Sequence, residues 1–262
     1  MKQILSVQDL SCVGKCSLTI ALPVISAMGC ACSVLPTAVL STHTAFPKPH
    51  IRSLTEDMEG ICRHWQEIGV KFDTISVGYL SDPKQVARVT QVLDAFPANL
   101  ILDPVMGDHG KLYSGITPEH VDAVKALIRR SDVLLPNITE AAFLTGLPYK
   151  ETTDAGYYRE LLMGLSDLGA KSVVLTGVSL ETGKTGFMGT DGTVYQAEKL
   201  PGNFHGTGDL FAAVFTGAYT NGKEEQAATL AAKFVERVIA ATGTPTPYGI
   251  AFESQLSWLS QQ

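Results

Sequence analysis

The stretch between Lys15 and Lys48 contains no lysine, arginine, aspartate or glutamate. A membrane-spanning helix needs about 20 consecutive, mostly apolar residues. Prolines, a glycine and several hydroxyl residues interrupt this stretch, among them Pro23, Gly29 and Pro36. We therefore predict a buried helix followed by a buried strand here, and no membrane span.

Positive charge and paired cysteines are also scarce. The chain has 20 Lys and Arg against 26 Asp and Glu, a formal net charge of −6, and no basic cluster, so we expect no nucleic-acid partner. The five cysteines, at positions 12, 16, 30, 32 and 62, contain no C-x-x-C pair. That spacing disfavours a zinc site, and the odd number disfavours a disulfide framework. The first residues show no signal-peptide pattern, and we expect a cytoplasmic protein.

Short apolar runs alternate with longer amphipathic segments along the 262 residues. No repeat or Pro/Ser-rich linker divides the chain, and its length suits one α/β domain. The alternation predicts a single domain over residues 1–262, with a mostly parallel central sheet and helices on both faces. The expected strands are 4–7, 32–35, 74–77, 99–102, 133–135, 171–176, 185–188 and 193–196. The expected helices are 17–28, 54–68, 83–95, 118–129, 139–144, 154–168, 207–219 and 224–241.

Polar clusters follow six of the expected strands, at the point where each strand reaches its carboxyl end. In open parallel sheets, ligands bind outside this edge of the sheet. The clusters therefore predict a binding site built from several loops. They are residues 8–14, 41–44, 78–80, 103–108, 136–140 and 176–177.

The turn Gly206-Thr207-Gly208-Asp209 stands at the start of an expected helix. A helix N-terminus carries unpaired N–H groups and partial positive charge, and glycines allow an anion to approach closely. A carboxylate would repel a merely bound phosphate, but it can act as a base when a hydroxyl group attacks a phosphoryl group. Asp209 is therefore a candidate base. The alternative is that Thr207 or Asp209 only caps the helix.

Further carboxylates stand at other strand ends. Asp103, Asp108 and Glu140 could together hold Mg²⁺, which often takes one or two protein carboxylates beside nucleotide phosphates. Asp103 could instead belong to a simple turn, and Glu140 could be a first-turn carboxylate favoured by the helix dipole. Asn137 could bridge a phosphate and a metal-bound water.

Other motifs give weaker signals. Residues 177–185 imitate a P-loop, but five residues separate the glycines and a strand-like run follows. Residues 206–211 imitate a dinucleotide fingerprint but end in Phe211, where Gly or Ala is needed. We reject both. His43 and His205 could take part in the chemistry, or they could only pack and hydrogen bond.

Together these residues resemble the ribokinase superfamily and, within it, the pyridoxal (vitamin B6) kinases. The resemblance runs nearly from end to end. Its motifs are Ser41-Thr42-His43-Thr44, Gly78-Tyr79-Leu80, Asp103-Pro104-Val105-Met106-Gly107-Asp108, Pro136-Asn137 with Glu140, and Gly206-Thr207-Gly208-Asp209-Leu210-Phe211-Ala212-Ala213. The resemblance implies a ribokinase-like homodimer that uses ATP to phosphorylate the 5′-hydroxymethyl group of pyridoxal, pyridoxamine or pyridoxine.

The resemblance also implies roles for three groups of residues. At the transferring phosphoryl group we expect Asp209 as the base, and an anion hole formed by Gly206, Thr207 and Gly208. At the nucleotide we expect Asn137 and Thr176 on the phosphates, and Asp103, Asp108 and Glu140 organising Mg²⁺ and a monovalent cation. Around the pyridine ring we expect Thr44 and Tyr79, with Val13 and His43 nearby.

One residue departs from the family pattern. Family members commonly carry a serine after the first-strand glutamine, where this chain has Asp9. An ionised carboxylate only accepts hydrogen bonds, so Asp9 would favour a protonated ring nitrogen or an aminomethyl group, and hence pyridoxamine. Hydroxymethylpyrimidine kinases share the fold and the glycine turn, and the exocyclic amine of their substrate could also pair with Asp9. A third alternative is a protein that binds B6 vitamers or a nucleotide without turnover.

Overall fold

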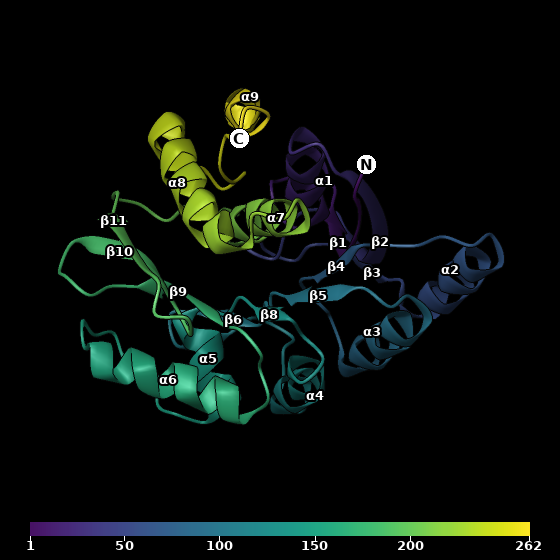
Figure 1. Ribbon diagram of the computed structural model, residues 1–262, viewed down its shortest axis with the longest axis horizontal. Helices are drawn as coiled ribbons and strands as arrows, with labels where there is room; N and C mark the ends of the chain where they lie inside the picture. The colour runs from purple at the N-terminus through teal and green to yellow at the C-terminus, as the bar shows by residue number, and fades with distance from the viewer. The chain divides into compact units, whose positions relative to one another are not determined.

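The computed structural model describes residues 1–262. The chain forms two compact units. The first comprises Met1–Asn99 together with Leu200–Gln262, and the second comprises Leu100–Lys199 (Figure 1). A single-domain organisation stays a prediction.

The first unit contains four strands in the order β3-β2-β1-β4. Strand β1 (Gln3–Ser11) pairs in parallel with β2 (Ala31–Leu40) and with β4 (Thr74–Val77), whereas β3 (Ile51–Ser53) pairs antiparallel with β2. The register between β1 and β2 shifts between Gln8 and Leu10. This irregularity sets the position of Asp9 near the carboxyl end of β1.

Helices cover both faces of this sheet (Figure 1). On one face, α1 (Leu18–Ala27) packs on β1 and β2, and α7 (Thr207–Thr220) packs on α1 and β4. Helix α8 (Glu224–Thr242) lies against α7. On the other face are α2 (Thr55–Glu67) and α3 (Pro83–Ala95), which pack on each other. The chain ends in a short 3-10 helix, Glu253–Gln255, and α9 (Leu256–Leu259), which contacts α1.

The charge-free stretch forms α1 and β2, as predicted. The apolar side chains of α1, among them Ile20, Val24 and Ile25, are buried. In β2 the buried residues are Leu35, Thr37, Ala38 and Leu40. None of the helices combines the length and the apolar character that crossing a bilayer requires.

The second unit contains a parallel strand pair, a meander and a small hairpin. Strand β5 (Asn99–Leu102) pairs in parallel with β8 (Val133–Leu134), and β9 (Val174–Val178), β10 (Lys184–Gly189) and β11 (Val194–Glu198) form an antiparallel sheet. Isolated parallel bridges join Leu134 in β8 to Val173 before β9, and Asn137 after β8 to Thr176 in β9. The hairpin consists of β6 (Gly107–Asp108) and β7 (Lys111–Leu112). The helices of this unit are α4 (Pro118–Ile128), α5 (Ile138–Thr145) and α6 (Ala155–Asp167).

The mostly parallel strands and their covering helices confirm the predicted α/β class. All the expected helices and strands are present within a few residues of their expected bounds, except that β1 continues to Ser11, through part of the expected polar cluster 8–14, and β2 continues to Leu40. Three features were not predicted: the exposed strand β3, the β6–β7 hairpin and the helical turns after residue 252.

Candidate active site

The glycine turn forms the N-terminus of α7. Gly206 precedes the first helical residue with φ 90°, a conformation in which a Cβ is unfavourable. A Cβ at Gly206 would lie 2.6 Å from the carbonyl oxygen of Lys15 and 2.8 Å from Cδ1 of Ile20. Gly208 has no positive φ, and a Cβ there would meet no heavy atom within 4 Å. The turn therefore requires glycine at 206 for its conformation, whereas Gly208 leaves the helix N-terminus open.

Asp209 lies in the first turn of α7 and is partly exposed. Burial, and to a smaller extent the nearby Asp9 carboxyl group, raise the pKa of Asp209 to about 6. The backbone N–H of Ser17 opposes this increase in part. A carboxyl group with a pKa near the working pH suits a general base.

Asp9 is buried close to Asp209. Its Oδ1 accepts a hydrogen bond from Ser17 Oγ at 2.5 Å, and its Oδ2 accepts one from Ser11 Oγ at 3.1 Å. Burial raises the pKa of Asp9, and these two hydroxyl groups oppose the increase. Burial, and the charge of Asp9, also raise the pKa of Tyr79. The structure thus brings two residues expected around the pyridine ring, Asp9 and Tyr79, near the expected base.

Ser17 was missed as a functional residue. It is buried, immediately precedes α1, and contacts both Asp9 and Asp209. The sequence signal was a hydroxyl residue at the start of a predicted helix, which normally indicates only a cap. The neighbouring Cys16 is also close to both carboxyl groups: burial, Asp209 and Asp9 raise the pKa of its thiol well above the usual value.

His43 hydrogen bonds through both ring nitrogens. Its Nδ1 accepts from the Ala45 N–H at 3.3 Å, so Nε2 carries the proton that is donated to the Pro247 carbonyl oxygen at 2.8 Å. The ring also lies 4.8 Å from the Phe46 ring and 5.5 Å from the His205 ring, between centroids. These contacts favour the packing and hydrogen-bonding interpretation of His43 over direct chemistry.

Two other residues expected around the pyridine ring are on the surface. Val13 is 47% exposed and Thr44 is exposed. Both belong to loops that follow strand ends, Val13 after β1 and Thr44 after β2. A hydrogen bond from the Val13 N–H to the Ser41 carbonyl oxygen joins these two loops. Their side chains are accessible to a ligand.

In the second unit, Asn137 and Glu140 form a capping box at the start of α5. Asn137 Oδ1 accepts from the Glu140 N–H at 2.9 Å, and Glu140 Oε2 accepts from the Asn137 N–H at 2.8 Å. Glu140 Oε1 accepts from the Met106 N–H at 3.1 Å. Burial raises the pKa of Glu140 to about 7, opposed by these backbone hydrogen bonds. Glu140 is thus first a structural group that joins the loop after β5 to α5.

Asn137 and Thr176 lie side by side. They form a parallel bridge between the ends of two strands, and the Thr176 hydroxyl group donates to the Pro136 carbonyl oxygen at 3.3 Å. Asn137 Nδ2 donates to the Gly107 carbonyl oxygen at 2.9 Å. The residues expected at the nucleotide phosphates are therefore adjacent, and Asn137 retains a second amide N–H for a ligand.

The structure contains no group of three or more His, Cys, Asp or Glu side chains placed to hold a metal ion. Asp103, Asp108 and Glu140 are therefore not a preformed three-carboxylate site. Asp108 is exposed in the β6–β7 hairpin, where its Oδ1 accepts from the His109 N–H. Such separate carboxylates still fit Mg²⁺ that is carried on nucleotide phosphates, because that ion keeps several waters and needs only one or two protein ligands.

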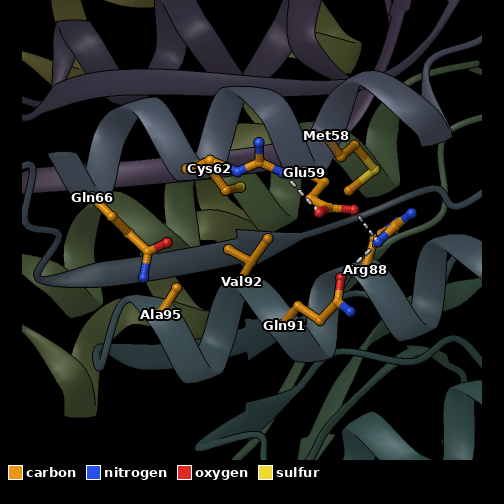
Figure 2. Close-up of a pocket in the computed structure, with 9 residues that line it drawn as sticks. Met58, Glu59, Cys62, Gln66, Arg88, Gln91, Val92 and Ala95 are labelled. Carbon is orange, nitrogen blue, oxygen red and sulfur yellow. Dashed lines mark hydrogen bonds and ion pairs between the residues drawn. The ribbon is translucent and has the colours of Figure 1, made fainter.

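A separate surface pocket of about 210 Å³ lies between α2 and α3. Figure 2 shows Arg88 directed toward Glu59, and the two side chains form an ion pair at 2.9 Å. The pocket shares no residue with the site described above, and its one glutamate, Glu59, pairs with both of its arginines, Arg63 and Arg88.

Known proteins resemble the chain along nearly its whole length. The family described as phosphomethylpyrimidine kinase matches residues 22–249. A pyridoxal kinase structure from Lactobacillus plantarum is 33% identical, has a TM-score of 0.89, and is matched over 99% of this chain and 96% of that chain. The chain belongs to the pyridoxal kinase family. The motif resemblance to the ribokinase superfamily is thereby confirmed.

Two further relatives agree with this assignment. A candidate phosphomethylpyrimidine kinase from Bacteroides thetaiotaomicron, crystallised with pyridoxal, is 34% identical with a TM-score of 0.92, over 100% of this chain and 96% of that chain. The pyridoxal kinase of Dictyostelium discoideum is 25% identical over 238 residues, which are 82% of this chain and 77% of the relative.

Proposed function

We propose that the chain uses ATP to phosphorylate the 5′-hydroxymethyl group of a B6 vitamer: pyridoxal, pyridoxamine or pyridoxine. The observation that carries this proposal is the carboxyl group of Asp209, whose pKa is about 6, behind the glycine turn at the N-terminus of α7. A pure anion site gains nothing from a carboxylate there. The family assignment and the relative crystallised with pyridoxal support the same activity.

In this proposal Asp209 takes the proton of the hydroxymethyl group as its oxygen attacks the phosphoryl group. The N–H groups of Gly206, Thr207 and Gly208 stabilise the negative charge that develops on the transferring group, because they point out of the positive end of α7. Gly206 holds the turn in its positive-φ conformation, and Gly208 leaves room for the phosphate oxygens. The chain's contribution is thus a placed base and a placed anion hole.

The vitamer pocket in this proposal is lined by Asp9, Val13, His43, Thr44 and Tyr79. Each oxygen of Asp9 already accepts one hydroxyl hydrogen bond, but a carboxylate oxygen can accept two. Asp9 therefore keeps the capacity to accept from a protonated ring nitrogen or an aminomethyl group. Since Asp9 replaces the family serine, we propose that the chain prefers pyridoxamine.

The nucleotide phosphates in this proposal are bound by Asn137 and Thr176. Bound Mg²⁺ would neutralise charge on the phosphates, and the residues that would hold it, with a monovalent cation nearby, are Asp103, Asp108 and Glu140. Glu140 has each oxygen engaged by one backbone N–H group, and each oxygen keeps a second lone pair for the ion or its water. We further propose a homodimer that works in the cytoplasm.

Two alternatives remain distinguishable from this proposal. A hydroxymethylpyrimidine kinase would use the same base and glycine turn but a different ring substrate, and the description of the matching family favours testing it. A binding protein without turnover would need no base, so the raised pKa of Asp209 argues against it.

The test is ADP release by the full chain with ATP and Mg²⁺, measured with pyridoxal, pyridoxamine, pyridoxine and hydroxymethylpyrimidine in separate reactions. We expect ADP with the B6 vitamers and the highest kcat/KM for pyridoxamine. Turnover of hydroxymethylpyrimidine alone would establish the other kinase activity. ADP release that no added substrate increases, together with measurable vitamer binding, would establish a binding protein.

A further inference from the structure

Ser17 has a backbone conformation that is normally reserved for glycine. Its φ is 46° and its ψ is −126°, a conformation in which the Cβ of every residue other than glycine is crowded by the backbone. Only three non-glycine residues have positive φ: Ser17, Lys48 and His109. Lys48 and His109 are exposed, whereas Ser17 is 4% exposed. A buried residue held in such a conformation indicates that its surroundings require it there.

Helix capping does not explain this serine. Serine is favoured before a helix because its hydroxyl group accepts a hydrogen bond from the backbone of the first turn. Ser17 makes no such side-chain cap on α1. Its carbonyl oxygen accepts from the N–H groups of Ile20 and Ala21. These backbone hydrogen bonds begin the helix, and the hydroxyl group takes no part in them. The hydroxyl group is therefore free to act elsewhere.

Both other polar groups of Ser17 are directed at carboxyl groups. The hydroxyl group donates to Asp9 Oδ1 at 2.5 Å, and the backbone N–H lowers the pKa of the Asp209 carboxyl group. Ser11 holds the second oxygen of Asp9. One residue thus joins a carboxyl group on β1 to a carboxyl group on α7, and its unusual φ lets the two donors of Ser17 reach both.

We propose that Ser17 is a positioning residue for phosphoryl transfer: from its glycine-like conformation it holds Asp9 beside Asp209, and it thereby fixes where the base stands. The proposal rests on the proposed function, because it requires that Asp209 is the base.

Several titratable groups surround the two carboxyl groups. They are Cys16 in the loop after β1, His43 in the loop after β2, Tyr79 after β4, and His205 before the glycine turn. Of the groups that affect Asp209, Asp9 is the one whose charge raises its pKa. The Ser17 hydroxyl group lowers the pKa of Asp9 and so favours its charged form. Ser17 thus supports the basicity of Asp209 through Asp9.

The test uses Ser17→Gly, which keeps the backbone conformation and the N–H but removes the hydroxyl group. Lys48→Gly is the matched control, because it also relieves a positive φ but lies outside the site. We expect Lys48→Gly to unfold near the wild-type temperature, and Ser17→Gly to fold but to unfold at a somewhat lower temperature, because it loses the buried hydrogen bond to Asp9. Ser17→Gly should lower kcat by about 10- to 100-fold, since a misplacement of about 1 Å can cost about 10²-fold, with little change in KM. Lys48→Gly should keep the wild-type kcat.

The pH profile separates this role from a purely structural one. Without the hydroxyl group, the pKa of Asp9 rises, Asp9 carries less charge at a given pH, and the pKa of Asp209 falls. The acid limb of kcat/KM should therefore move to lower pH in Ser17→Gly. A kcat equal to that of the wild type, or a lower kcat with an unmoved acid limb, would overturn the proposal. If Ser17→Gly does not fold, Ser17→Ala is measured against the same two outcomes.

The same assay keeps the two proposals apart. If the wild type releases no vitamer-dependent ADP while Ser17→Gly folds, the proposed function has failed. If the wild type is active and Ser17→Gly behaves like Lys48→Gly, the function stands and the role of Ser17 has failed.

Discussion

Gly206 and Gly208 look equivalent in the sequence, but the structure predicts opposite consequences for replacing them with alanine. At Gly206 the positive φ should cost about 1–2 kcal/mol for a residue with a Cβ. The Cβ would also lie 2.6 Å from the Lys15 carbonyl oxygen, and such overpacking costs about 1–3 kcal/mol. We therefore expect Gly206→Ala to lower the free energy of unfolding by about 2–5 kcal/mol.

Gly208 has neither problem. It lies in the first turn of α7 without a positive φ, and a Cβ would meet nothing within 4 Å. Alanine is better than glycine in a helix by about 0.5–1 kcal/mol, so Gly208→Ala should be as stable as the wild type or slightly more stable. The added methyl group would occupy the space that a phosphate oxygen needs. We expect kcat to fall by about 10²-fold, the usual effect of losing one anion-hole donor.

The assay pairs urea unfolding with ADP release at saturating ATP and vitamer. Gly183→Ala is the control, because Gly183 has φ 83° but an open environment, so it reports the conformational cost without the clash. A Gly206→Ala protein as stable as Gly183→Ala would refute the packing argument. A Gly208→Ala protein with wild-type kcat, or with a changed KM for the vitamer only, would refute the assignment of this turn to the transferring phosphate.

Three further predictions concern the carboxyl groups. Asp209→Asn should lower turnover by about 10²–10⁴-fold, while vitamer binding measured by calorimetry persists and the fall of wild-type kcat/KM below a pH of about 6 disappears. The folded pKa of Asp209 is raised above its ordinary value, so the charged carboxylate destabilises the wild type at pH 7. The variant should therefore match or exceed the wild-type stability at pH 7, and this advantage should vanish as the pH falls from about 6 to about 4. Asp9→Ser should lower kcat/KM for pyridoxamine relative to pyridoxal by roughly three- to thirty-fold, and an unchanged ratio would exclude recognition of the amine. An equal loss with both vitamers would instead fit recognition of the ring nitrogen that both carry, or the coupling through Ser17. Glu140→Gln should lower the free energy of unfolding measured in urea by about 1–3 kcal/mol. The two oxygens of Glu140 accept from two different backbone N–H groups, and the amide would replace one of these oxygens with an NH2 group that cannot accept. Wild-type stability would contradict the capping-box role.

The sequence predicted the elements that the core stabilises and missed those held by pairing alone. Strand β4 was predicted because all four of its residues are apolar or small and all are buried. Strand β3 was missed because its three residues are exposed and only its pairing with β2 fixes it. The β6–β7 hairpin has two-residue strands, and a hydrogen bond from the Gly110 N–H to Thr139 Oγ1 anchors its turn. No periodicity in the sequence reports such contacts.

Within the candidate site, residue types were predictable but their contacts were not. Asp9, Asp209, Asn137 and Glu140 were found because chemically active side chains at strand and helix ends stand out in an apolar chain. Ser17 was missed because its role depends on a positive φ and on two partners that are 8 and 192 residues away in the sequence. The capping box of Glu140 shows the reverse case, since the residue expected at a metal also has a structural function.

The surroundings of the two neighbouring carboxyl groups differ in a way that bears on their roles. Burying two carboxyl groups together opposes folding at neutral pH, because each raises the proton affinity of the other. The hydroxyl groups of Ser11 and Ser17 stabilise the charged form of Asp9, whereas Asp209 is opposed only by backbone N–H groups. Two hydroxyl donors hold Asp9 in position and oppose the rise of its pKa on burial, while Asp209, with a pKa of about 6, can exchange a proton near neutral pH. Asp9 therefore suits the role of a fixed electrostatic partner, and Asp209 suits the role of a base. For this reason Asp209 in the first turn of α7, rather than Asp9 on β1, is the candidate base.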